Sequence, residues 1–373
     1  MEFENLGIEI DGEAVSDLYP DLIKLEVELD EELAAMFRIR IALPQLPAGT
    51  WGKLDDARLS LWKPVTITAG FESGTEELIA GYITHLRPDF DPDPAGCTLE
   101  IWGLDGSVLM DREQKLKAWA NKKDSDIASE ILGTYGFGAT IEDTQVVHEE
   151  AVSTIVQRET DMQFLRRLAL RNGYECYVEG TTGFFRPPQI DASPQPVLAA
   201  QFGDETNLMR FSAEVNALAP ANVAMSQIDR LNKEVLDASA ESSLETPLGQ
   251  ADAQSLLGAG VDPGKVYVGM NVATGSAEMT ALCQGLFHRG QWFVTAHGTV
   301  AANLYGHVLR PRRTVTIKGV GEIYSGLYYV THVTHAFGAD GYVQNFSAKR
   351  NALQPTGTEE FSAAGGGLLS AVL

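Results

Sequence analysis

The residues Arg158 to Gly180, RETDMQFLRRLALRNGYECYVEG, contain the clearest structural signal in the chain. Thr160 and Gln163 have the spacing of a capping box, in which the hydroxyl accepts a hydrogen bond from the amide of the third helical residue. The apolar residues that follow recur at helical spacing, namely Phe164, Leu165, Leu168 and Ala169. Gly173 can then adopt the left-handed backbone conformation that ends many helices. The sequence therefore predicts a capped helix that leads into a short strand, Tyr174 to Val178.

The composition is that of a globular protein, with 373 residues, 44% of them hydrophobic and 21% charged. This length predicts two or three domains. The balance of 28 basic and 51 acidic residues gives a net charge of −23, which argues against nucleic-acid recognition because the chain repels phosphates. The acidic start and the lack of a long apolar run predict no signal peptide and no membrane span. We therefore expect a protein that is made in a cytoplasm and stays soluble there.

The three cysteines, Cys97, Cys176 and Cys283, are far apart in the sequence and odd in number. This spacing matches neither a disulfide framework nor a metal site. We predict that they are buried, reduced side chains.

The first 105 residues show apolar and polar residues in strict alternation. Ile23, Leu25, Val27 and Leu29 alternate with Lys24, Glu26 and Glu28. This period predicts half-buried antiparallel strands. Similar runs follow at Phe37–Ile41, Val65–Ala69, Leu78–Leu86 and Thr98–Gly103. Five or six short strands predict a small barrel or sandwich for residues 1–105.

Residues 106–194 are predicted to form an α/β insert. Besides the capped helix, the stretch Asp124–Leu132 has an apolar side at helical spacing, with Asp124 or Ser125 as its cap and Gly133 as its end. The Pro-rich stretch Arg186–Pro196 then marks the end of the insert.

Residues 195–352 are predicted to form a second β-barrel domain. Its strands are expected at Met209–Val215, Ala221–Ile228, Trp292–Val300, Thr314–Ile317, Leu327–His335 and Tyr342–Arg350. We expect a long loop at residues 231–263, where no period is sustained, and a helix at Ser276–His288. Residues 353–373 are predicted to be a flexible C-terminal tail.

The order of residues after Arg158 resembles a known protein family. An R-E-T-D-x-x-F-L-x-R-L-A run followed by N-G-Y and an aromatic strand is similar to the phage late-control D proteins and to the hub portion of VgrG spike proteins. The residues Tyr324 to Ala352 also resemble the closing hairpin of the family's second barrel. The resemblance covers residues 1–352. These families form baseplate hubs of contractile tails and type VI secretion machines.

The resemblance implies a mainly β protein with α/β insertions, an α+β fold with two tandem small β-barrels. Three copies would form a homotrimer whose six barrels make a pseudo-hexameric ring. The implied partners are an inner tube or tube-initiator protein, a separate spike protein and baseplate or wedge proteins. The chain would be made in a bacterial cytoplasm and become part of an assembled tail or injection particle, and the role requires no cofactor. VgrG proteins continue into a spike, and we expect that no spike is encoded here.

Several short patterns have some features of a metal or phosphate site, but each lacks a residue or a geometry that such a site requires. Asp89, Asp91, Asp93 and Glu100 have calcium-loop spacing, but Pro94 occupies the position that requires glycine. His332 and His335 are an odd number of residues apart, which places them on opposite faces of a strand. The glycine clusters lack a strand, turn and helix in the order that phosphate binding needs. We therefore predict no catalytic, cofactor-binding or metal-binding residue.

Two groups of residues are candidates for contacts between proteins. The arginines Arg166, Arg167 and Arg171 on the capped helix either face solvent or meet carboxylates of an adjacent subunit. The apolar residues near the C-terminus are Leu368, Leu369, Val372 and Leu373. They belong either to a disordered tail or to an arm that docks on the spike or on a neighbouring subunit.

The sequence leaves three classes of function to weigh. The leading hypothesis is a structural hub, not an enzyme, that closes a ring at the end of an inner tube. The alternative is a tail-associated polysaccharide or cell-wall hydrolase that uses a carboxylate pair on a β-rich scaffold. The third is a carbohydrate-binding β protein without catalysis. A stable trimer would favour the hub, whereas wall hydrolysis lost on mutation of one carboxylate would favour the hydrolase.

Overall fold

The computed structural model describes residues 6–46, 49–151, 154–218, 221–229, 232–257, 261–269, 273–339 and 341–359. Within these residues most regular structure is β-strand, and the helices are few. The prediction of a mainly β chain with a few helices is confirmed. Short 3-10 helices lie at Ser16–Asp21, Ala57–Leu59, Pro94–Gly96, Gly106–Asp111 and Gly203–Glu205.

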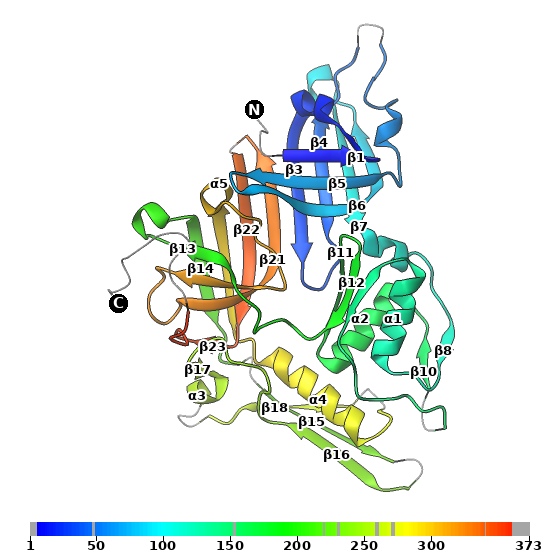
Figure 1. The fold of residues 1–373 in the computed structure, drawn as a ribbon, viewed down its shortest axis with the longest axis vertical. Helices are drawn as coiled ribbons and strands as arrows, with labels where there is room; N and C mark the ends of the chain where they lie inside the picture. The colour runs from blue at the N-terminus through cyan, green and yellow to red at the C-terminus, as the bar shows by residue number, and fades with distance from the viewer. Residues whose placement is uncertain are drawn as a thin grey trace.

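One sheet of 13 strands runs through both halves of the chain (Figure 1). Its N-terminal strands are β1 (Leu6–Ile10), β2 (Glu13–Ala14), β3 (Leu22–Asp30), β4 (Met36–Ala42), β5 (Pro64–Phe71), β6 (Gly74–Asp89) and β7 (Thr98–Asp105). Its C-terminal strands are β13 (Gln195–Ala199), β14 (Leu208–Val215), β19 (Val294–Ala301), β20 (Thr314–Lys318), β21 (Gly326–Gly338) and β22 (Gly341–Arg350). The main strand order is β14-β19-β22-β21-β3-β4-β7-β6-β5-β1-β2. In addition, β20 pairs antiparallel with β21, and β13 pairs parallel with β20.

The two halves join where β3 pairs antiparallel with β21. His332 to Phe337 of β21 lie opposite Asp30 to Leu25 of β3. This pairing continues the backbone ladder from one half into the other, so the halves are fixed side by side.

Each half of the sheet has its own apolar core. Leu25 and Val27 of β3 are fully buried with Ile39 of β4 and Ile67 of β5 in the N-terminal core. Val333 and Phe346 lie in the C-terminal core with Val315 of β20. The alternation predicted from the sequence therefore decides which side chains fill each core.

A β-bulge corrects one prediction on β3. The register shifts between Leu22 and Lys24, so Leu22 is buried whereas Ile23 is 38% exposed. The extra residue turns Ile23 away from the core although it fits the alternation.

The residues between β7 and β13 form two helices on a small sheet. The elements are β8 (Lys117–Trp119), α1 (Asp124–Thr134), β9 (Gly138–Ile141), β10 (Ile155–Gln157), α2 (Asp161–Asn172), β11 (Glu175–Glu179) and β12 (Thr182–Arg186). The strand order is β11-β12-β9, and β8 pairs with β10. Phe164, Leu165 and Leu168 of α2 are fully buried in the core of this unit.

The predicted ends of α2 are confirmed. The Oγ1 atom of Thr160 accepts a hydrogen bond from the Gln163 amide at 3.3 Å, and Gly173 has a φ of 68°. The predicted ends of α1 are wrong by one or two residues. The amide of Lys123 donates to the Asp126 carboxylate, so Lys123 is the N-cap, and Gly133 lies inside the helix.

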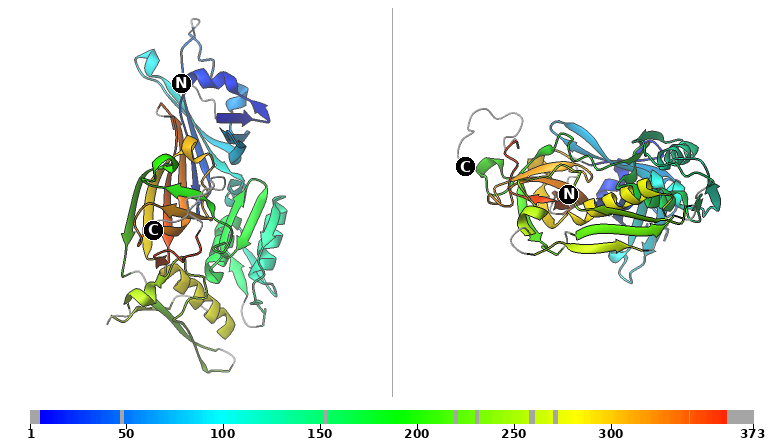
Figure 2. Two further views of the ribbon diagram at one scale, coloured as in Figure 1. Left: turned by 60° about the vertical axis from the view of Figure 1, so that its left-hand side comes forward. Right: turned by 90° about the horizontal axis from the view of Figure 1, so that it is seen from below.

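A second small layer lies at the end of the molecule away from the N-terminal strands (Figures 1 and 2). It contains β15 (Ala221–Ile228), β16 (Val235–Ala240), β18 (Gly264–Val268) and α4 (Ser276–Gly290). The helix predicted at Ser276–His288 is confirmed and packs on β15 and β16 through Met279, Cys283 and Phe287.

The prediction of a long loop at residues 231–263 is wrong in part, because this stretch contains β16, β17 (Ala251–Asp252) and α3 (Ala253–Leu257). The side chains of β16 that face α4 include Ala238 and Ala240, whose small size hides the strand pattern. The remaining short elements are α5 (Ala302–Tyr305) and β23 (Ala352–Leu353). In the described part of the chain, the helices are too short or too polar to cross a membrane.

Candidate functional site

The three candidate arginines of α2 lie in different environments. Arg171 forms an ion pair with Glu278 of α4, and their side chains are only 18% and 8% exposed. Burial lowers the pKa of Arg171. The expectation of a solvated face is wrong for Arg171, because α4, which lies more than 100 residues later in the chain, covers it.

The apolar candidates near the C-terminus are not described by the structure. Leu368, Leu369, Val372 and Leu373 lie outside the described residues.

The contact between α2 and α4 depends on two glycines. A Cβ atom on Gly285 of α4 would lie 2.8 Å from the backbone nitrogen of Gly173. Gly173 also has the positive φ that favours glycine. The two backbones therefore touch at a point where neither residue has a side chain.

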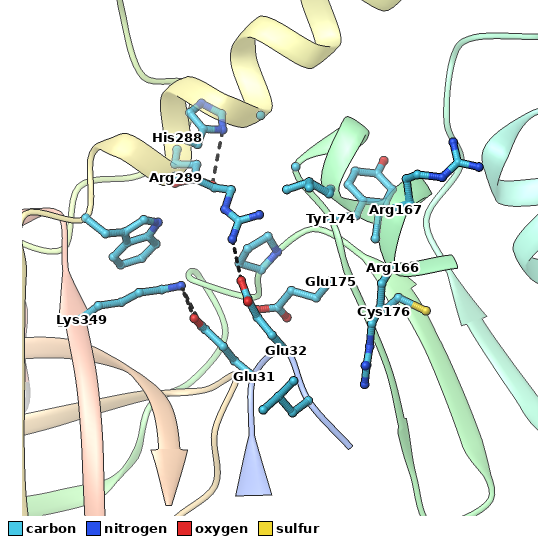
Figure 3. Close-up of a pocket in the computed structure, with 18 residues that line it drawn as sticks. Glu31, Glu32, Arg166, Arg167, Tyr174, Glu175, Cys176, His288, Arg289 and Lys349 are labelled. Atoms are coloured by element: carbon cyan, nitrogen blue, oxygen red, sulfur yellow. Dashed lines mark hydrogen bonds and ion pairs between the residues drawn. The ribbon is translucent and has the colours of Figure 1, made fainter. Parts of the chain in front are cut away.

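A cavity of about 370 Å³ opens beside this contact (Figure 3). Its walls come from the turn after β3, from α2 and β11, from the end of α4, and from β22. Residues that line it include Glu31, Glu32, Leu33, Arg166, Leu170, Tyr174, Glu175, Glu245, His288, Arg289, Trp292 and Lys349. We call it the junction pocket, because the large sheet and both smaller units meet there.

Two ion pairs connect the turn after β3 to its neighbours (Figure 3). The Nζ atom of Lys349 lies 2.7 Å from Glu31 Oε2 and above the ring of Trp292. The Nη2 atom of Arg289 lies 2.6 Å from Glu32 Oε1. The second pair is largely exposed and stabilises little, whereas the first is about four-fifths covered. Both glutamates are therefore neutralised within the chain.

Glu245 and His288 form a second polar contact in the pocket. Nε2 of His288 accepts a hydrogen bond from the amide of Leu244 at 3.1 Å. The other ring nitrogen, Nδ1, then carries the proton of the neutral ring and faces Glu245 Oε1 at 3.4 Å. Burial lowers the pKa of His288 and raises the pKa of Glu245 to about 7. A carboxyl with this pKa exists in both protonation states near neutral pH.

Glu175 is held by a tyrosine at the back of the pocket. Its Oε1 atom accepts a hydrogen bond from the Tyr329 hydroxyl at 2.6 Å. Burial raises the pKa of Glu175, although that hydrogen bond and the charges of Arg312 and Lys349 oppose the shift. The pocket thus contains two carboxyls that are harder to ionise than ordinary glutamates.

Arg166 is the cation of the pocket for which no ion pair is found among the described residues. Its Nε atom is buried and has no hydrogen-bond partner among the described residues. Arg167, by contrast, donates to Glu159 at 2.7 Å and to the carbonyl of Val156 at 3.1 Å. Arg166 therefore has free hydrogen-bonding capacity beside the cavity.

Sequence reasoning found Arg166 and Arg167 but missed the other polar residues of the junction pocket. Glu31, Glu245, His288 and Lys349 come from four separate segments, so no local spacing connects them. A glutamate before a turn and a histidine near a helix end are ordinary features in a sequence. Only the fold brings them together.

The patterns considered for metal binding have other contacts. Asp91 and Asp93 accept hydrogen bonds from backbone amides of their own loop, and Glu100 pairs with Arg38 at 2.7 Å. No group of three metal-ligating side chains is close enough to hold an ion in the part of the chain that the structure describes.

The two histidines of β21 lie on opposite faces, as predicted. His332 is partly exposed, with Nδ1 3.1 Å from Asp30. His335 is fully buried, with Nδ1 2.8 Å from the Tyr342 hydroxyl.

The fold is similar to that of solved tail proteins. The 43 kDa tail protein of prophage MuSo2 from Shewanella oneidensis matches with a TM-score of 0.69 at 13% identity, over 94% of this chain and 99% of that chain. The tail protein from Neisseria meningitidis MC58 matches with a TM-score of 0.62 at 14% identity, over 93% and 96%. The E. coli c3393 protein, a type VI secretion component similar to T4 tail proteins gp27 and gp5, gives 0.54 at 12% identity, over 92% and 76%.

At identities this low, these likenesses establish the fold and nothing further about activity. No curated protein sequence matches the chain. A family model described as the Alg8 N-terminal domain matches residues 2–338, which is most of the chain. The chain therefore belongs to the Alg8 N-terminal domain family.

Proposed function

We propose that this chain is the structural baseplate hub of a contractile injection machine, a phage tail, a tailocin or a related secretion system. In this role it links the inner tube to a separate spike protein and contacts baseplate or wedge proteins. The observation that carries the proposal is the single sheet that passes through both halves in a fold shared with tail proteins.

Two β-rich halves in each chain would allow a threefold assembly to match a sixfold tube. A homotrimer of chains with two β-rich halves presents six β-rich units in a closed ring, and such a ring can match a sixfold tube. The pairing of β3 with β21 supports a ring of this kind, because it joins the two halves in one continuous sheet. We retain residues 1–105 and 195–352 as the two proposed ring-forming domains and residues 106–194 as the insert outside them.

The solvent-facing side of the sheet supports a role as a channel lining. Lys24 pairs with Glu26 at 2.6 Å, and Arg38 pairs with Glu100 at 2.7 Å. The C-terminal half presents Arg210, His297, His332, Asn345 and Ser347 around a shallow hollow. Charges of both signs on a hydrated surface would give cargo little to adhere to.

The oligomeric state of the purified chain tests this proposal. Native mass spectrometry should find a trimer, either for the chain alone or after addition of a candidate spike protein. A monomer under both conditions would contradict the hub.

A second function has one specific observation in its favour. Glu245, with its pKa raised to about 7, could donate a proton in the way that the acid of a glycosidase does. Glu175 lies in the same pocket. The test is cell-wall turnover by the purified protein and by Glu245→Gln. Turnover that this substitution abolishes would establish the hydrolase.

A further inference from the structure

The junction pocket has an apolar side that its ion pairs do not use. Leu33 and Leu170 at its edge are 63% and 38% exposed, and the rings of Tyr174 and Trp292 also line it. Large apolar side chains exposed around a hollow are typical of protein contacts, in which one side chain of the partner fills the hollow. A cavity of about 370 Å³ has room for a leucine or an aromatic side chain.

The charges of the pocket favour an anionic neighbour for that side chain. Glu31 and Glu32 are neutralised by Lys349 and Arg289. Glu175 and Glu245 resist ionisation because they are buried. Arg166 remains, with a buried Nε atom that lacks a partner among the described residues. The ion pairs of the neighbouring arginines, Arg167 with Glu159 and Arg171 with Glu278, have no counterpart at Arg166 among the described residues. A carboxylate in the cavity would pair with the Arg166 guanidinium through a charge-assisted hydrogen bond.

We propose that the junction pocket binds a segment of a partner protein that inserts one large apolar side chain and pairs an adjacent carboxylate with Arg166. The two features line one cavity, so one short segment can reach both. A phosphate fits less well, because it would pair with Arg166 and leave the apolar side of the cavity unfilled. The inference does not depend on ring formation, since the pocket is complete within one chain.

Short blocked peptides can test this on the full-length protein. We would compare Ser-Phe-Asp-Ser, Ser-Phe-Asn-Ser and Ser-Phe-Lys-Ser, each with a fluorinated phenylalanine observed by fluorine NMR. The aspartate peptide should bind about tenfold more tightly than the asparagine peptide, which corresponds to one charge-assisted hydrogen bond. The lysine peptide should bind most weakly.

Three variants separate the two parts of the proposed contact. Arg166→Gln should abolish the preference for aspartate and leave binding of the asparagine peptide unchanged. Leu33→Ala should weaken all three peptides by a similar factor, because it removes apolar contact only. Arg40→Gln, which removes an exposed arginine on β4, is the matched control and should change nothing.

Three outcomes would overturn the proposal. Equal binding of the aspartate and asparagine peptides would show that Arg166 takes no carboxylate. Tightest binding of the lysine peptide would assign the pocket to a cation held by Glu245. Failure of every peptide to saturate the protein at millimolar concentration would show that the pocket is no receptor for such a segment. Each result is readable whether the chain is a monomer or a trimer.

Discussion

The N-terminal and C-terminal halves of the large sheet are stabilised in different ways. The N-terminal core consists of alternating apolar side chains such as Leu25, Val27 and Ile39. Among the described residues of the large sheet, the polar side chains with 0% exposure are His335, Gln344 and Arg350, and all three lie on β21 and β22. The C-terminal half therefore adds fully buried hydrogen-bonding side chains to its apolar core, whereas the N-terminal strands depend mainly on apolar packing.

Two of these buried polar groups, Arg350 and Gln344, bind segments outside the sheet. Arg350 donates to the carbonyls of Leu248 at 2.9 Å, Ser325 at 3.0 Å and Gln354 at 2.5 Å. Gln344 bonds the amide of Leu309 and the carbonyl of His307. The C-terminal half therefore anchors long excursions of the chain, whereas the N-terminal half is built from neighbouring strands.

The largest expected effect comes from removing the buried arginine. Arg350→Leu leaves the carbonyls of Leu248, Ser325 and Gln354 without their donor. We expect a loss of about 3–5 kcal/mol in the free energy of unfolding, measured by urea denaturation. Arg38→Gln breaks a partly exposed pair in the N-terminal half and should cost at most about 1 kcal/mol. Similar losses for the two variants would remove the contrast between the halves.

An apolar truncation in the N-terminal half tests whether the halves unfold together. Ile39→Ala should cost about 3 kcal/mol, because Ile39 is almost fully buried. The β3–β21 ladder predicts one cooperative transition, with the same midpoint for probes in either half. Two separate transitions would mean that the β3–β21 pairing does not couple the unfolding of the two halves.

Acid should weaken the C-terminal half through His335. Burial lowers the pKa of His335 to about 3, below the ordinary histidine value of 6.5. A lowered histidine pKa contributes stability that is present above pH 6.5 and is lost as the pH falls toward 3. The expected slope is about 1.4 kcal/mol per pH unit from this one group. His335→Gln should flatten that slope in urea titrations between pH 6 and pH 4, whereas an unchanged slope would assign it to other groups.

The smallest effect tests how the second layer is attached. Gly285→Ala places a methyl group 2.8 Å from the backbone nitrogen of Gly173 and should push α4 away from α2. We expect a cost of about 1–3 kcal/mol and faster hydrogen exchange in α4, with little change in the N-terminal strands. Exchange that rises equally in β3 and β4 would mean that the layer supports the whole sheet.

Most of the strands and helices could be predicted from the sequence, because alternation and capping are local signals. The capped helix at Thr160 and the helix predicted at Ser276–His288 are examples. Strand β1, LGIEI, shows the same alternation, although no strand was predicted there. Strand β16 was not recognised, since two of the three side chains on its core-facing side are alanines, Ala238 and Ala240 beside Leu236.

The candidate site was less predictable than the fold. Spacing on α2 identified Arg166 and Arg167, but it could not show that α4 buries Arg171 against Glu278. Long-range contacts of this kind leave no local period. The same reason explains why Glu245 and His288 went unnoticed until the fold placed them in one pocket.

The hub assignment is tested most directly by a density map of the intact particle from which the chain comes. The account predicts three copies in a closed ring between the end of the inner tube and the spike, with the continuous sheets facing the channel. A map with one copy, or with copies outside the tube axis, would contradict it.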